Sequence, residues 1–139
     1  MNILRKTFIV AAISCAAAWL LKMVAIAATG GAETDASVVG VLWTVGMVTF
    51  LLAAGTGTAL VLVRAPSWTR VLAGVAAVPV AFALLNYLDA AMKAVYESDG
   101  WFRDELSLVV AGVVMGALGI SRLGAGQLRG DRLARASRS

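Results

Sequence analysis

Four long apolar runs, separated by short polar clusters, dominate the chain. They cover about residues 7–29, 37–63, 68–96 and 106–121. Within each run the apolar positions are nearly continuous, whereas the elements of a soluble core interleave polar positions at a period of 3.6 or 2 residues. At about 1.5 Å per residue, the three longer runs can cross a hydrocarbon core about 30 Å thick. The pattern predicts an all-α polytopic membrane protein, a four-transmembrane-helix up-down-up-down bundle over residues 1–122.

The breaks between the runs contain residues that end and start helices. Pro66 stops the second run, and Ser67 can cap the third. Pro79 lies near the middle of the third run, where the loss of a helix hydrogen bond predicts a kink. The fourth run is short for a membrane crossing, so we expect either local thinning of the bilayer or an end held by Trp101 and Phe102.

Composition supports a lipid environment. The chain is 60% hydrophobic with a mean hydropathy of +0.87, whereas an ordinary soluble domain is roughly 45–50% apolar. A length of 139 residues holds one small domain. The first run continues well past Cys15, further than a cleaved leader needs, so we interpret it as a spanning helix and not as a signal peptide.

Charge is distributed unevenly between the two sides of the predicted bundle. The amino terminus, the turn between the second and third runs, and the tail hold nine of the twelve basic residues. The two remaining loops hold six of the eight carboxylates and Arg103 as their one cation. By the positive-inside rule both termini face the cytoplasm. Arginine outnumbers lysine nine to three beside abundant alanine, glycine and valine, which favours a bacterial source and an inner-membrane location.

Residues 123–139 form a basic tail that is rich in glycine, arginine and serine. This composition predicts a disordered cytoplasmic segment. Its arginines should be attracted to anionic lipid head groups, within a Debye length of the surface. They are Arg129, Arg132, Arg135 and Arg138. The tail has no aromatic residue that could stack on a base, so nucleic-acid binding is not expected.

Two absences exclude whole classes of membrane oxidoreductase. The chain has no histidine, which removes bis-histidine haem, histidine metal ligation and histidine base catalysis. It has one cysteine, so it cannot form an intrachain disulfide or a Cys-x-x-Cys pair. The acids of the second acidic loop could bind a divalent cation, but they lack EF-hand spacing and are interpreted as solvated charge. These acids are Glu97, Asp99, Asp104 and Glu105. We therefore expect no enzyme activity, cofactor or metal.

A polar cluster near the outer ends of the first and third helices is the candidate functional site. At about 1.5 Å per residue, Lys22 lies about 22 Å and Asp89 about 27 Å from the inner ends of their helices. Their similar depth predicts an ion pair between these two helices. Lys93 follows Asp89 in the favourable i,i+4 order. Neighbouring polar side chains complete the predicted cluster: Asn86, Tyr87 and Tyr96.

This cluster has a structural and a functional interpretation. In the first, the charges form an ionic latch at the outer rim, with the lysine side chains reaching toward water. In the second, they form an outward-facing polar cup in which Asp89 titrates or binds a cation, because a charged residue on a spanning helix often marks a functional site. Spacings of three and four residues put Cys15, Trp19, Lys22 and Ile26 on one face of the first helix.

Glycines in the fourth run predict close helix packing. Gly112 and Gly116 form a Gly-x-x-x-Gly pair, and Gly119 follows three residues later. Small residues let helix backbones approach one another in a membrane. We expect this face to pack inside the bundle, whereas an outward orientation would favour a dimer.

Two functional hypotheses follow from the sequence. The first is a non-enzymatic accessory or scaffold subunit that packs with itself or with a larger membrane complex, because the loops are too short to hold a catalytic site. The alternative is a small transporter or channel subunit that uses Asp89, with Lys22, Asn86 and Lys93, as a titrating or ion-binding site.

Overall fold

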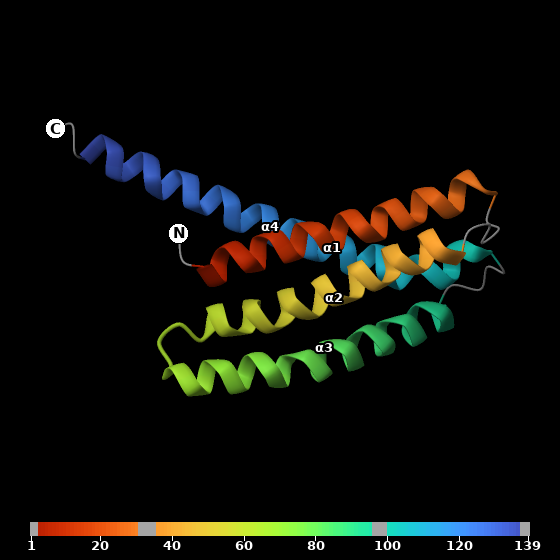
Figure 1. Cartoon of the computed structure of the whole chain (residues 1–139), viewed down its shortest axis with the longest axis horizontal. Coiled ribbons are helices and arrows are strands. Elements are labelled where there is room, and N and C mark those ends of the chain that lie inside the picture. The colour runs from red at the N-terminus through yellow and green to blue at the C-terminus, as the bar shows by residue number, and fades with distance from the viewer. Residues whose placement is uncertain (1–2, 31–35, 96–99, 137–139) are drawn as a thin grey trace.

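The computed structural model describes residues 3–30, 36–95 and 100–136, and the side chains of 36–37, 103–104 and 123–136 are not among the features it describes. Four helices account for almost all of this chain: α1 (Ile3–Ala28), α2 (Ala36–Val61), α3 (Ser67–Val95) and α4 (Trp101–Ala136) (Figure 1). The described ranges contain no strand. The all-α prediction is therefore confirmed.

All four helices include a segment long and apolar enough to cross a membrane. These segments are Ile3–Ala28, Val38–Val61, Ser67–Val95 and Glu105–Arg122. The shortest has 18 residues, which corresponds to about 27 Å of helix. Four such helices in 139 residues define a small multi-pass membrane protein. The fourth segment includes Glu105, which the sequence analysis placed in the preceding loop.

The helices pack in a ring in which each contacts the next. α1 packs against α2 and α4, and α3 also packs against α2 and α4. The end of α1, the start of α2, the end of α3 and the start of α4 lie together, and we call this the loop end (Figure 1). The connection between α2 and α3 lies at the opposite end, which we call the turn end. Backbone bonds close this connection, from Ala65 N to Leu62 O at 2.9 Å and from Arg70 N to Pro66 O at 3.1 Å.

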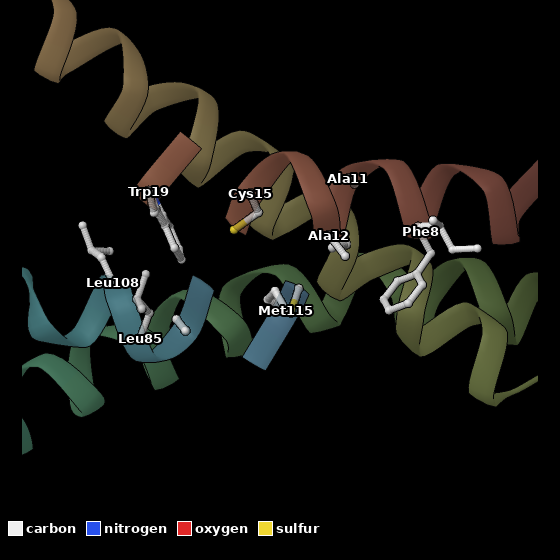
Figure 2. Close-up of a cluster of buried hydrophobic side chains, with 11 residues drawn as sticks. Phe8, Ala11, Ala12, Cys15, Trp19, Leu85, Leu108 and Met115 are labelled. Atoms are coloured by element: carbon white, nitrogen blue, oxygen red, sulfur yellow. The ribbon is translucent and has the colours of Figure 1, made fainter. Parts of the chain in front are cut away.

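The core is built around one face of α1. Phe8, Ala12, Cys15 and Trp19 recur every three or four residues, and all are buried. Side chains of the other three helices pack against them (Figure 2). These include Ala53, Leu85, Leu108, Ala111 and Met115. α1 is therefore the central helix of the bundle.

Glycines bring the helices into close contact at several points. A Cβ atom on Gly46 of α2 would overlap the indole ring of Trp19. A Cβ atom on Gly116 would lie 3.1 Å from Cβ of Ala16, and one on Gly119 would lie 3.1 Å from Cγ1 of Ile13. These contacts replace the hydrophobic driving force that lipid does not supply between helices.

α2 and α3 expose most of their apolar side chains. Val48, Leu52, Val75 and Leu84 are all at least half exposed. Such surface matches a lipid environment. Pro79 lies within α3, which continues as one helix through it, and the kink expected there stays a prediction.

The tail differs from its prediction. Sequence analysis expects disorder over residues 123–139, but the backbone of α4 is helical through Ala136. The extension adds residues to a helix that is already nucleated by packing, and leucine, arginine, alanine and glutamine favour helix. Residues 137–139, with Arg138, lie outside the described chain. The attraction of the tail arginines to lipid stays a prediction.

Candidate functional site

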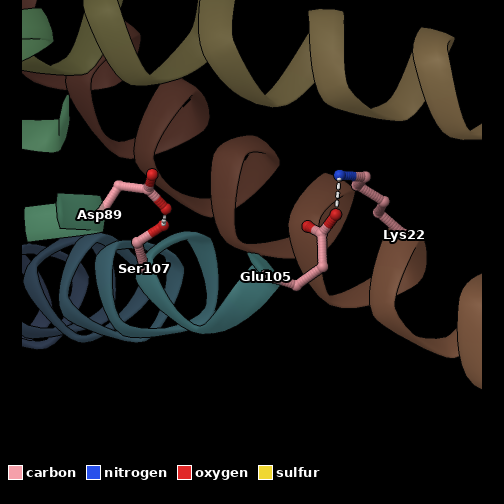
Figure 3. Close-up of polar contacts among 4 residues, drawn as sticks. All are labelled: Lys22, Asp89, Glu105 and Ser107. Carbon is pink, nitrogen blue, oxygen red and sulfur yellow. Dashed lines mark hydrogen bonds and ion pairs between the residues drawn. The ribbon is translucent and has the colours of Figure 1, made fainter. Parts of the chain in front are cut away.

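A buried ion pair joins α1 to α4 near the loop end. Nζ of Lys22 donates to Oε1 of Glu105 at 2.5 Å (Figure 3). The two residues are only 5% and 9% exposed. Lys22 continues the buried face of α1, one turn beyond Trp19, as the spacing of that face predicts. The burial of these two charges is tolerated because each neutralises the other.

The predicted partner of Lys22 was wrong. Sequence analysis paired Lys22 with Asp89, whereas Lys22 contacts Glu105 in the structure. Asp89 instead binds Nζ of Lys93 at 2.9 Å, the i,i+4 contact that its spacing predicts, and accepts from Oγ of Ser107 at 3.0 Å. Lys22 and Asp89 do lie at the same end of the bundle, where both line one cavity. They do not pair, because α1 packs mainly against α2 and α4 and not against α3.

Glu105 is the one charged residue of this cluster that the sequence did not lead us to predict, although a signal for it exists. The glycines predicted to pack are Gly119, Gly116 and Gly112. Continuing toward the start of the helix from Gly112, steps of four and three residues reach Leu108 and Glu105. Residues at this spacing share one helix face. All three glycines face α1, at Ala12, Ile13, Ala16 and Trp19. Glu105 therefore lies on the face that meets α1.

α4 links two neighbours through residues only two positions apart. Glu105 and Ser107 are separated by about 200° around the helix, so Glu105 reaches Lys22 on α1 while Ser107 reaches Asp89 on α3 (Figure 3). The first turns of α4 therefore connect α1 to α3. Ser107 is 2% exposed.

These side chains surround a polar cavity of about 250 Å³ at the loop end. Its polar wall consists of Lys22, Asn86, Asp89, Lys93, Glu105 and Ser107, and its apolar wall of Trp43, Met47, Phe82, Leu85 and Leu108. Two ammonium and two carboxylate groups make the formal charge of the wall zero. A cavity of this volume and polarity has room for several water molecules.

The structure brings four of the six predicted cluster residues to this cavity: Lys22, Asn86, Asp89 and Lys93. Tyr87 is 75% exposed on the outside of α3. Tyr96 lies outside the described residues. The side-chain amide of Asn86 donates to the carbonyl of Phe82, in its own helix, at 2.8 Å.

Two buried polar atoms beside the cavity have no hydrogen-bond partner among the described residues. They are Oε2 of Glu105 and Nε1 of Trp19. Lys22 occupies only the other oxygen of Glu105. Because an unsatisfied buried oxygen is costly, Oε2 is the atom of this cavity best suited to accept a hydrogen bond from water or a small solute.

The cavity does not continue through the bundle as a polar path. The buried polar side chains of the described chain are those of Lys22, Glu105 and Ser107, and all three line the cavity. Toward the turn end the buried side chains are apolar, and Figure 2 shows Trp19, Leu85 and Leu108 together, with Cys15, Met115 and Phe8 beyond them. The threonines of α2 donate to carbonyls of their own helix, as at Thr44 and Thr56.

The described residues contain no group of three histidine, cysteine, aspartate or glutamate side chains that could hold a metal ion. Of the four loop acids considered above, Glu105 is paired with Lys22, and Glu97 and Asp99 lie outside the described residues. The side chain of Asp104 is also not described. Cys15 is fully buried.

The fold and the site together define a small multi-pass membrane protein with a charge-neutral polar cavity at one end. Comparison with protein-family models, with curated proteins and with solved structures found no match.

Proposed function

We propose that this chain is a non-enzymatic accessory or scaffold subunit of the bacterial inner membrane that packs with itself or with a larger membrane complex. It crosses the bilayer four times, up-down-up-down, with both termini in the cytoplasm. The distribution of basic residues supports this orientation. The internal pairing of the charged groups supports a structural role for the polar cluster, since each carboxylate there already contacts a lysine.

The observation that carries the proposal is an exposed stripe along α3 in which four of six residues are alanine. Spacings of three and four residues place six exposed side chains within a narrow band of that helix: Ala76, Val80, Ala83, Tyr87, Ala90 and Ala94. We call this band the alanine stripe. The small side chain of alanine makes few contacts with lipid, but it lets another helix approach closely. Gly112, Gly116 and Gly119 of α4 already pack against α1, so α3 offers the better surface for assembly.

Cysteine cross-linking in native membranes tests this assembly. Ala83→Cys places a thiol in the alanine stripe, and Val113→Cys places one on an exposed position of α4 as the matched control. The native Cys15 is fully buried and contributes little background. We expect Ala83→Cys to form a disulfide-linked or bismaleimide-linked product with a second copy or a larger subunit, and Val113→Cys to remain monomeric. Equal products from both positions, or none from either, would contradict the proposal.

The polar cavity favours a second candidate function, a small transporter or channel subunit. Asp89 is about one-third exposed at the cavity wall, and Glu105 offers an unpaired oxygen there. A complete path would require a second copy or a rearrangement of the apolar core. Flux through proteoliposomes decides between the two functions. Transport that is abolished by Asp89→Asn, without loss of folded protein, would replace the scaffold proposal.

A further inference from the structure

An apolar groove lies between α2 and α3 at the turn end, far from the polar cavity. Its volume is about 390 Å³. Leu52, Gly55 and Ala59 of α2 and Arg70, Gly74 and Val75 of α3 contribute to its walls. Cβ atoms added to Gly55 or Gly74 would each lie 3.1 Å from the carbonyl oxygen of the other, so the two backbones meet directly. Both glycines line the groove.

Polar groups gather where the groove reaches the turn end. Nε of Arg70 donates to the carbonyl of Ala59 at 3.4 Å, and Arg70 lines the groove. Ser67 also lines the groove and is the first residue of α3. The first amides of α3 have no partner within the helix, and this helix end carries a partial positive charge. Free helix amides and a guanidinium are groups that bind phosphate.

The described charged side chains at the turn end, around the groove, are all positive. Arg5, Lys6, Arg64, Arg70 and Arg122 all lie at the turn end. Arg5 donates to the carbonyl of Arg122, which brings the start of α1 beside α4. Among the residues whose side chains are described, no aspartate or glutamate lies at this end. Trp68, at 66% exposure, stands next to Ser67, in the position that interfacial tryptophans take at head-group level.

We propose that this groove binds one anionic phospholipid, with its phosphate at Arg70 and the start of α3 and one acyl chain along the groove. Charge complementarity selects the anionic head group. A zwitterionic lipid would place its own ammonium or choline group among the arginines, whereas phosphatidylglycerol brings only negative charge. This site is distinct from the predicted attraction of the tail arginines to the lipid surface.

Native mass spectrometry of the purified protein, reconstituted with phosphatidylglycerol or phosphatidylcholine and then partly delipidated, tests the site. The wild type should retain one phosphatidylglycerol per chain in preference to phosphatidylcholine. Arg70→Gln should lower phosphatidylglycerol retention about tenfold, the effect of losing one charge-assisted contact. Arg64→Gln is the matched control, because Arg64 lies in the same turn but does not line the groove.

A second pair of variants tests the channel itself. Val75→Trp fills the groove from an exposed position, and Leu84→Trp places the same side chain at an exposed position of α3 outside both the groove and the alanine stripe. Only Val75→Trp should reduce lipid retention. Equal losses in Arg70→Gln and Arg64→Gln would show attraction to surface charge alone and overturn the proposal. Retention without preference for phosphatidylglycerol, or no retention by the wild type, would overturn it as well.

Discussion

At the scale of single residues, the buried pair of Lys22 and Glu105 has the largest energetic consequence. Removing one member leaves the other charge buried without compensation, whereas replacing both with apolar residues removes the desolvation cost of both. Lys22→Met should therefore lower the free energy of unfolding by about 3 kcal/mol. The double variant Lys22→Met with Glu105→Leu should recover most of this loss.

Thermal unfolding in detergent, followed by circular dichroism, measures both effects. A coupling energy between the two sites close to zero would show that the charges do not stabilise one another in the folded protein.

Among the glycines that the structure describes, Gly46 leaves the least room for a side chain, because Trp19 packs against it. A methyl group on Gly46 overlaps the indole ring, which is 1% exposed and has no room to move. We expect Gly46→Ala to destabilise the bundle by about 1–3 kcal/mol. Gly40→Ala on the same helix is the control, because nothing lies within 4 Å of a Cβ atom there. It should be neutral or slightly stabilising, since alanine favours helix over glycine. Chemical unfolding of the two variants in mixed micelles compares them directly.

At the scale of helices, α3 is held at its two ends by different contacts. At the turn end its backbone meets α2 through Gly55 and Gly74, and near the loop end Asp89 accepts from Ser107 of α4. Ser107→Ala removes the second contact, which contributes roughly 1 kcal/mol. Hydrogen exchange should then rise in the last turns of α3 and stay unchanged in α1. Ser121→Ala is the control, because Ser121 bonds only to Leu118 of its own helix. Faster exchange in both variants would contradict this role of Ser107.

The helices show how far sequence reasoning can go. Continuous apolar runs determine where each spanning helix lies, and spacings of three and four residues determine the buried face of α1 through Trp19 and Lys22. The partner of Lys22 was not predictable from depth, because two helices present a carboxylate at similar depth and only the order of packing around the ring selects Glu105. The start of α4 was also misplaced, because the polar residues before Leu106 resemble a loop in composition although they continue the helix.

At the scale of the whole molecule, the asymmetry of charge predicts the orientation in the membrane. Five described cations lie at the turn end, which the positive-inside rule assigns to the cytoplasm. A cysteine at Thr34, in the loop after α1, should react with a membrane-impermeant maleimide added outside intact cells. A cysteine at Arg64, which is exposed in the turn, should react only after the membrane is permeabilised. The reverse pattern would invert the proposed topology.

The Lys22–Glu105 pair joins residues 83 positions apart in the chain, and this separation bears on biogenesis. Lys22 enters the membrane with the first helix, while its counter-ion is supplied by the last. Until residue 105 has been synthesised, the nascent chain lacks the carboxylate that pairs with Lys22. Neutralisation of Lys22 therefore coincides with insertion of the final segment, so a prematurely terminated chain differs electrostatically from the finished one.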